Sequence, residues 1–148
     1  MGKERGALGR GLASILGTNI TDISSNTKVE NQTITAENYT LECLNFIFCT
    51  DDYLHNMNVQ YLEHDTLTDV ITFDNSDIET EIEGDIFISI DRVSENATIF
   101  DTTTEKELHR VILHGTLHLL GYKDKSETEQ QIMRQKEDFY LRFFKTLA

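Results

Sequence analysis

The chain has 148 residues, 39% of them hydrophobic, and a formal net charge of −13 at pH 7. A chain of this length fits one domain that buries about two thirds of its unfolded surface, so folding requires no disulfide or structural metal. The charge argues against broad attraction to nucleic acid, whose non-specific affinity comes from Lys and Arg meeting phosphates. No apolar run approaches the roughly 20 residues that span a bilayer, and no apolar signal core follows Met1. We therefore expect a soluble cytoplasmic protein without a membrane partner.

Residues 1–38 differ in composition from the rest of the chain, being first Gly-rich and then rich in Ser, Thr and Asn. They show no hydrophobic periodicity, so we predict a flexible tail over 1–38 and a globular domain over 39–148. Within the tail, the segment 3–17 contains Leu-Gly-Arg-Gly-Leu and resembles the opening of ParB-type chromosome-partition proteins. This resemblance implies an interaction peptide, with a gene-boundary accident or a coincidence as alternatives.

The first half of the globular part predicts a small sheet with one helix. Residues 44–49 form a largely apolar run that suits a buried strand. Thr50 is placed to cap a helix whose apolar face is Leu54, Met57 and Tyr61. Residues 70–73 and 85–90 read as two further strands, separated by the acidic, turn-like segment 74–84.

Two helices are predicted in the second half. The first spans Thr102 to Leu120, with Thr104 and Glu107 at capping-box spacing and Gly121 as its terminator. The second begins at Ser126, capped with Glu129. Apolar residues recur along it at helical spacing, and we predict that they pack in the core rather than stack on bases: Ile132, Phe139, Tyr140, Phe143 and Leu147.

The first predicted helix carries a candidate metal site. His114 and His118 are four residues apart, so both imidazoles project from one face about one turn apart and can reach a common ion. A chain that turns back at Gly121 can bring Asp124 to the same ion. Three protein ligands leave the fourth tetrahedral position open, which is typical of a catalytic zinc. We therefore predict one zinc ion, with hydrolysis as its chemistry.

Other uses of this spacing remain open from the residues alone. Two histidines four apart can simply cover a helix face, although the glycine stop and the following carboxylate favour a metal site. Zincin peptidases carry their general base directly after the first histidine, where this chain has Gly115, so peptidase activity is disfavoured. Two histidines and one carboxylate also bind Fe(II) in oxygenases, but the strand-borne ligand pattern of those enzymes is missing.

Three collinear blocks resemble the YbeY family. Residues 113–124 are similar to its signature His-Gly-x-Leu-His-Leu-x-Gly-Tyr-Asp-His, and residues 58–73 and 84–88 match two upstream blocks. The resemblance covers roughly residues 44–144. It implies a zinc-dependent, single-strand-specific endoribonuclease that matures the 3′ end of small-subunit rRNA and takes part in ribosome quality control, with rRNA and the small ribosomal subunit as partners. The implied fold is α+β, a small mixed sheet packed with helices and a zinc site at the end of the His-bearing helix.

The chain departs from the family in three ways. Asp124 stands where most members have a third histidine, and a carboxylate is an acceptable zinc ligand. Leu62 replaces an arginine thought to assist at the RNA phosphate, and Arg110, one helical turn before His114, is a speculative catalytic substitute. The strand and helix with which the family begins are not recognisable in residues 1–40.

Two alternative functions follow. The first is a ribosome-assembly binding protein that keeps the zinc site but catalyses little, which Leu62 and the acidic charge favour. The second is a metal-dependent hydrolase of a small substrate. For the nuclease, either water or the RNA 2′-hydroxyl is a possible nucleophile, and the sequence offers no clear general base. We expect structural roles for three acidic residues of the matched blocks: Asp65, Asp69 and Asp85.

Overall fold

The structure is a computed structural model that describes residues 29–62 and 68–145. Residues 29–36 are helical. The elements that follow are β1 (Thr40–Cys49), α3 (Asp51–Leu62), β2 (Val70–Asp74), β3 (Glu81–Ser89), α4 (Ile90–Ile99), α5 (Thr104–Leu119) and α6 (Glu127–Lys145). None of these helices is long and apolar enough to cross a membrane.

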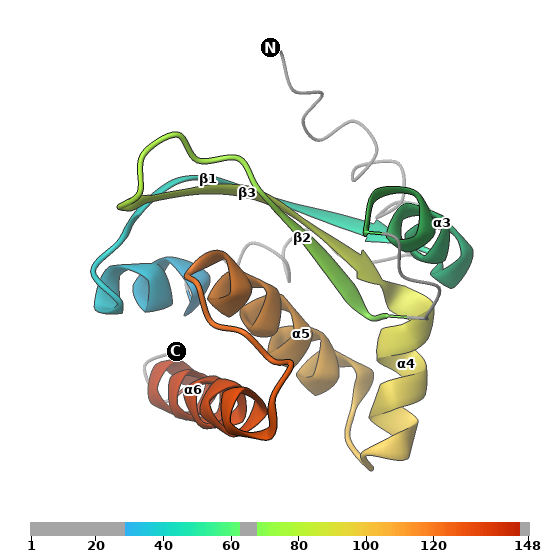
Figure 1. Cartoon of the computed structure of the whole chain (residues 1–148). Coiled ribbons are helices and arrows are strands. Elements are labelled where there is room, and N and C mark those ends of the chain that lie inside the picture. Colours follow the sequence, from blue (N-terminus) through green and yellow to red (C-terminus); the bar gives the residue numbers. More distant parts are fainter. Residues whose placement is uncertain (1–28, 63–67, 146–148) are drawn as a thin grey trace.

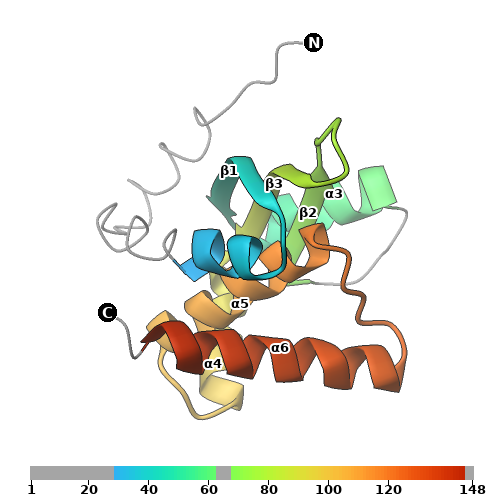
Figure 2. The same ribbon diagram turned by 90° about the vertical axis from the view of Figure 1, so that its left-hand side faces the viewer.

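A three-stranded mixed sheet forms one layer, in the order β1-β3-β2. The central strand β3 pairs in parallel with β1 and antiparallel with β2. In Figures 1 and 2, α5 lies against this sheet and α6 lies on the side of α5 away from the sheet. The predicted α+β class with a small mixed sheet is confirmed.

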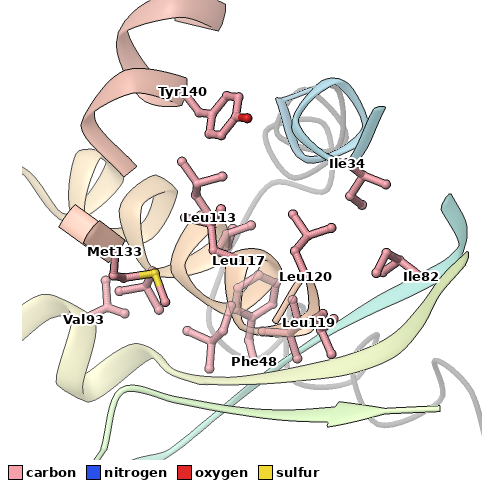
Figure 3. Close-up of a cluster of buried hydrophobic side chains, with 14 residues drawn as sticks. Ile34, Phe48, Ile82, Val93, Leu113, Leu117, Leu119, Leu120, Met133 and Tyr140 are labelled. Atoms are coloured by element: carbon pink, nitrogen blue, oxygen red, sulfur yellow. The ribbon is translucent and has the colours of Figure 1, made fainter. Parts of the chain in front are cut away.

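The main core fills the space between the sheet, α5 and α6. Ile86 and Ile88 of β3 point toward α5, where Leu113 and Leu117 are fully buried. Figure 3 shows these leucines between Phe48 of the sheet layer and the α6 residues Met133 and Tyr140. Alternate strand residues point the other way and pack with α3, in a second cluster built on Cys49, Leu54 and Ile71. In the main core, the sheet on one side and α6 on the other fix the position of α5 and of the histidines on it.

The amino-terminal boundary differs from the prediction of a tail over 1–38. Residues 29–36 are helical, and Ile34 has none of its surface exposed in the main core. Glu37, just after this helix, accepts hydrogen bonds from Tyr122 and Tyr140. The segment from residue 29 onward thus packs as part of the domain, so a helix does precede the first strand. The ParB-like segment lies outside the described residues.

Helix α4 was not predicted, and it begins where the third strand was expected to end. Ser89 leaves β3 and caps α4, its hydroxyl oxygen accepting a hydrogen bond from the backbone N–H of Arg92. Only Val93 and Ala97 of α4 are buried. Ile90, Val93 and Ala97 stand at helical spacing, so the periodicity was present but was overlooked because the third strand was extended over Ile90.

The predicted helix ends are close to the observed ones. The cap of α5 is one residue earlier than expected, because Thr103 rather than Thr104 accepts from the N–H of Lys106. The capping box of α6 is confirmed, since Ser126 and Glu129 exchange side-chain to backbone hydrogen bonds. Gly121 ends α5 with φ +103°, a left-handed conformation that favours glycine.

The prediction that the apolar stripe of α6 packs in the core is wrong for three of its residues. Ile132, Phe139 and Phe143 are exposed, whereas Tyr140 is buried. The face that α6 turns inward carries Met133, Glu137 and Tyr140 instead. Leu147 lies outside the described residues.

Candidate metal centre

Three predicted ligands converge where α5 ends. His114 and His118 occupy its last turns, and the left-handed turn at Gly121 brings the chain back so that Asp124 faces both rings. The two Nε2 atoms are 3.0 Å apart. Asp124 Oδ2 lies 3.2 Å from Nε2 of His114 and 3.3 Å from Nε2 of His118. These three residues could therefore hold one metal ion.

The partners of the two rings fix which nitrogens carry protons. His114 Nδ1 lies 2.7 Å from Glu137 Oε2, and His118 Nδ1 lies 2.9 Å from the backbone oxygen of Tyr122. A carboxylate and a carbonyl only accept hydrogen bonds, so both Nδ1 atoms carry the proton and donate it. In neutral rings both Nε2 lone pairs then face Asp124. Three acceptors at van der Waals distance repel one another unless a cation lies between them.

The spacing and type of these donors fit a small divalent metal. Tetrahedral zinc with ligand bonds of about 2.0–2.1 Å separates its ligand atoms by about 3.3–3.4 Å. The three separations in the structure, 3.0, 3.2 and 3.3 Å, are close to this value. All three side chains are partly exposed, so a fourth ligand can approach. Two nitrogens and one carboxylate oxygen are zinc ligands, and the same set also suits Fe(II).

The surroundings shift the pKa values of the two histidines in opposite directions. Burial lowers the pKa of His114, but the hydrogen bond and charge of Glu137 outweigh burial, so the net shift is upward. Burial also lowers the pKa of His118, and the neighbouring His114 lowers it further. Asp124 faces both rings, whereas Glu137 contacts only His114, so negative charge is concentrated around His114.

Glu137 is a part of the site that the sequence reasoning missed. Its carboxylate is 7% exposed, and its second oxygen, Oε1, lies 2.9 Å from Arg110 Nη1. Arg110 also pairs with Asp138 through Nη2 at 2.8 Å. The only sequence signal for Glu137 is its place on the inward face of α6, four residues after the buried Met133 and three before the buried Tyr140.

Arg110 lies near the site and is already paired with carboxylates. Both of its Nη atoms are held by carboxylates of α6. It lines a cavity of about 1220 Å³ together with His114, Asp124 and Glu137. Lys106 and Arg134, both exposed, line the same cavity, and Lys123 and Lys125 are exposed beside Asp124.

Besides Glu137, three acidic residues outside the predicted ligand set line this cavity: Asp69, Glu105 and Glu107. Burial raises the pKa of Asp69, and burial followed by the charge of Asp69 raises that of Glu107. Glu107 was expected to cap α5 but is buried instead. The backbone oxygen of Asp69 accepts from the N–H of Ser89.

Three other residues singled out in the sequence, Asp85, Asp65 and Leu62, are not part of the metal site as the structure describes it. Asp85 accepts hydrogen bonds from the side-chain amides of Asn45 and Asn75, a structural role as expected. Asp65 lies outside the described residues. Leu62 ends α3, and its side chain also lies outside the described part.

Gly115, between the two histidines, faces the sheet. A Cβ at this position would lie 2.9 Å from Ile86 Cγ2 and 3.3 Å from Val70 Cγ2. A side chain placed here would clash with the sheet, so the close packing of α5 on β2 and β3 favours glycine at this position. Glycine offers no general base where zincins carry theirs, which supports the argument against a peptidase.

The comparisons with known proteins give one family. The sequence profile described as "Endoribonuclease YbeY" matches residues 16–145. The Endoribonuclease YbeY of Cytophaga hutchinsonii is 58% identical over 102 residues, which are 69% of this chain and 71% of that protein. That of Amoebophilus asiaticus is 54% identical over 108 residues, 73% of this chain and 74% of the relative. Among solved structures, the solution structure of TM1509 from Thermotoga maritima is similar with a TM-score of 0.57 and 25% identity, covering 88% and 89% of the two chains.

Proposed function

The chain belongs to the YbeY endoribonuclease family, and from this premise we propose that it is a zinc-dependent endoribonuclease that cuts single-stranded RNA during 3′-end maturation of small-subunit rRNA. One zinc ion is held by His114, His118 and Asp124. The observation that carries the proposal is the convergence of these three acceptors within 3.3 Å of one another beside a large cavity. The cytoplasm and the small ribosomal subunit are the setting that this activity implies.

The protein's own residues prepare the centre for RNA cleavage. When bound, zinc supplies a Lewis acid that polarises a phosphoryl oxygen and lowers the pKa of water. Glu137 and the Tyr122 carbonyl orient the two rings so that both Nε2 lone pairs face the ligand position. Asp124 adds an anionic oxygen to the set. The nucleophile that attacks phosphorus is a water or the RNA 2′-hydroxyl.

Binding of an RNA strand must overcome the net charge of −13. Lys106 and Arg134 have exposed side chains on the cavity that contains the ligands, and they can meet phosphates of a strand lying there. Zinc itself adds two positive charges at the centre. A direct phosphate contact by Arg110 would require it to leave Glu137 or Asp138.

The test is cleavage of a single-stranded RNA that carries the 3′ end of small-subunit rRNA, with zinc content measured on each sample. We expect wild type to bind one zinc and cut, and His114→Ala and Asp124→Ala to lose both properties. His55→Gln, on α3 and outside the cavity, is the control and keeps both. Cleavage by a zinc-free His114→Ala protein would contradict the proposal.

A second candidate is a ribosome-assembly factor that keeps the metal but cuts little. Two observations favour it: Leu62 replaces the family arginine, and both Nη atoms of Arg110, the candidate substitute, are held by carboxylates. Stoichiometric zinc with no RNA cleavage, together with salt-sensitive binding to the small subunit, is the result that would select this function.

A further inference from the structure

We propose that Glu137 is a positioning residue of the metal centre, which sets the tautomer and orientation of His114 and is itself held in place by Arg110. The inference rests on the proposed function, because it takes His114 as a zinc ligand. It assigns to α6, a helix with no ligand of its own, a direct part in building the site.

Both oxygens of Glu137 are engaged in a way that fixes the carboxylate. Oε2 accepts from His114 Nδ1 at 2.7 Å, and Oε1 accepts from Arg110 Nη1 at 2.9 Å. Rotation of the carboxylate would break one contact or both. Because Glu137 is 7% exposed, water can replace a lost contact only poorly. The carboxylate is thus a rigid acceptor for one histidine ring.

The helix that carries Glu137 is anchored on both sides of it. Met133, one turn before, and Tyr140, one turn after, are both buried in the main core. The interface of α6 with α5 therefore determines where the carboxylate lies. His118 differs, because its Nδ1 donates to a backbone oxygen of its own segment, at Tyr122. His114 is the ligand whose orientation depends on a side chain from another helix.

A carboxylate partner also changes the ligand chemically. The hydrogen bond to an anion increases the electron density on the ring, so Nε2 becomes a stronger donor to a metal. Loss of such a partner typically weakens metal binding by about 10–100-fold.

A purely structural role for Glu137 is the competing explanation, since its pair with Arg110 also joins α5 to α6. Asp138 provides the matched control. It pairs with the same guanidinium at 2.8 Å, whereas in the described part of the chain the carboxylate partners of His114 are Glu137 and Asp124. Asp138→Asn therefore weakens the interhelical ion pairing and leaves the histidine partner in place.

The experiment measures zinc affinity of the full chain by chelator competition, and the melting temperature of the metal-free protein, for wild type, Glu137→Ala, Glu137→Gln and Asp138→Asn. We expect zinc binding to weaken about 10–100-fold in Glu137→Ala. Glu137→Gln keeps an acceptor oxygen without the charge and should lie between Glu137→Ala and wild type. Asp138→Asn should bind zinc within about threefold of wild type, even if its melting temperature falls.

Wild-type zinc affinity in Glu137→Gln or Glu137→Ala would overturn the inference, and so would an equal loss of affinity in Asp138→Asn. If Glu137→Ala does not fold, the decision rests on Glu137→Gln, which preserves the side-chain volume. Failure of the proposed function is a different result, namely a wild-type protein that binds no zinc.

Discussion

Replacing Gly115 by alanine tests whether the close contact between α5 and the sheet positions the candidate ligands His114 and His118. The new Cβ would lie 2.9 Å from Ile86 Cγ2, 3.3 Å from Ile86 Cδ1 and 3.3 Å from Val70 Cγ2. Ile86 is fully buried in β3, so it has no free space into which it can move. Overpacking of this kind costs about 1–3 kcal/mol, while alanine gains about 1 kcal/mol over glycine in a helix interior.

The difference between these two effects leads us to expect that Gly115→Ala lowers the free energy of unfolding by up to about 2 kcal/mol, measured by urea denaturation of the metal-free protein. Because the helix must shift away from the sheet, zinc affinity should fall as well. In a double-mutant cycle, Ile86→Ala removes the atoms that the new methyl meets, so Gly115→Ala should cost less in that background. A stabilising Gly115→Ala, or strict additivity in the cycle, would refute the reasoning.

Three further predictions concern other parts of the molecule. Burial raises the pKa of Glu30 from its ordinary value of 4.5 to about 8, so the folded state binds the proton more tightly than the unfolded state. The free energy of unfolding therefore falls as the pH rises from about 4.5 to about 8. Glu30→Gln should remove this pH dependence in denaturation experiments and stabilise the protein by on the order of 3 kcal/mol at pH 7. Glu37→Ala leaves the hydroxyls of Tyr122 and Tyr140 without their acceptor and should cost about 2–4 kcal/mol in urea denaturation, whereas wild-type stability in this variant would exclude the contact. Zinc at 100 times its Kd should stabilise wild type by about 2.7 kcal/mol and His118→Ala much less, and an equal melting shift in both would place the ion elsewhere.

The helix that carries the two candidate histidine ligands was predictable to within two residues at its start and one at its end. Its apolar residues recur with a clear helical period, and Gly121 supplies a stop signal that the structure uses with a positive φ. The approach of Asp124 to the two histidines was predictable because the distance is set by a short local turn. Local patterns therefore gave the candidate ligand set.

Contacts between segments far apart in the sequence were not predictable. Glu137 lies 23 residues from His114, and only the packing of α6 on α5 brings them together. The helix at 29–36 has a mostly polar sequence, yet Ile34, Thr33 and Glu30 are buried in it. In both cases tertiary packing decides the environment, and neither hydrophobic period nor motif spacing reports it.

The most direct test of the central claim is a zinc titration of metal-free protein, followed by single-turnover cleavage of the rRNA 3′-end substrate at each point. If His114, His118 and Asp124 form the catalytic zinc site, cleavage starts from the background rate and rises with added zinc until one equivalent is bound. The Asp124→Ala protein should stay at background over the same range. Undiminished cleavage by wild type without zinc, or cleavage by Asp124→Ala equal to that of wild type, would contradict the account.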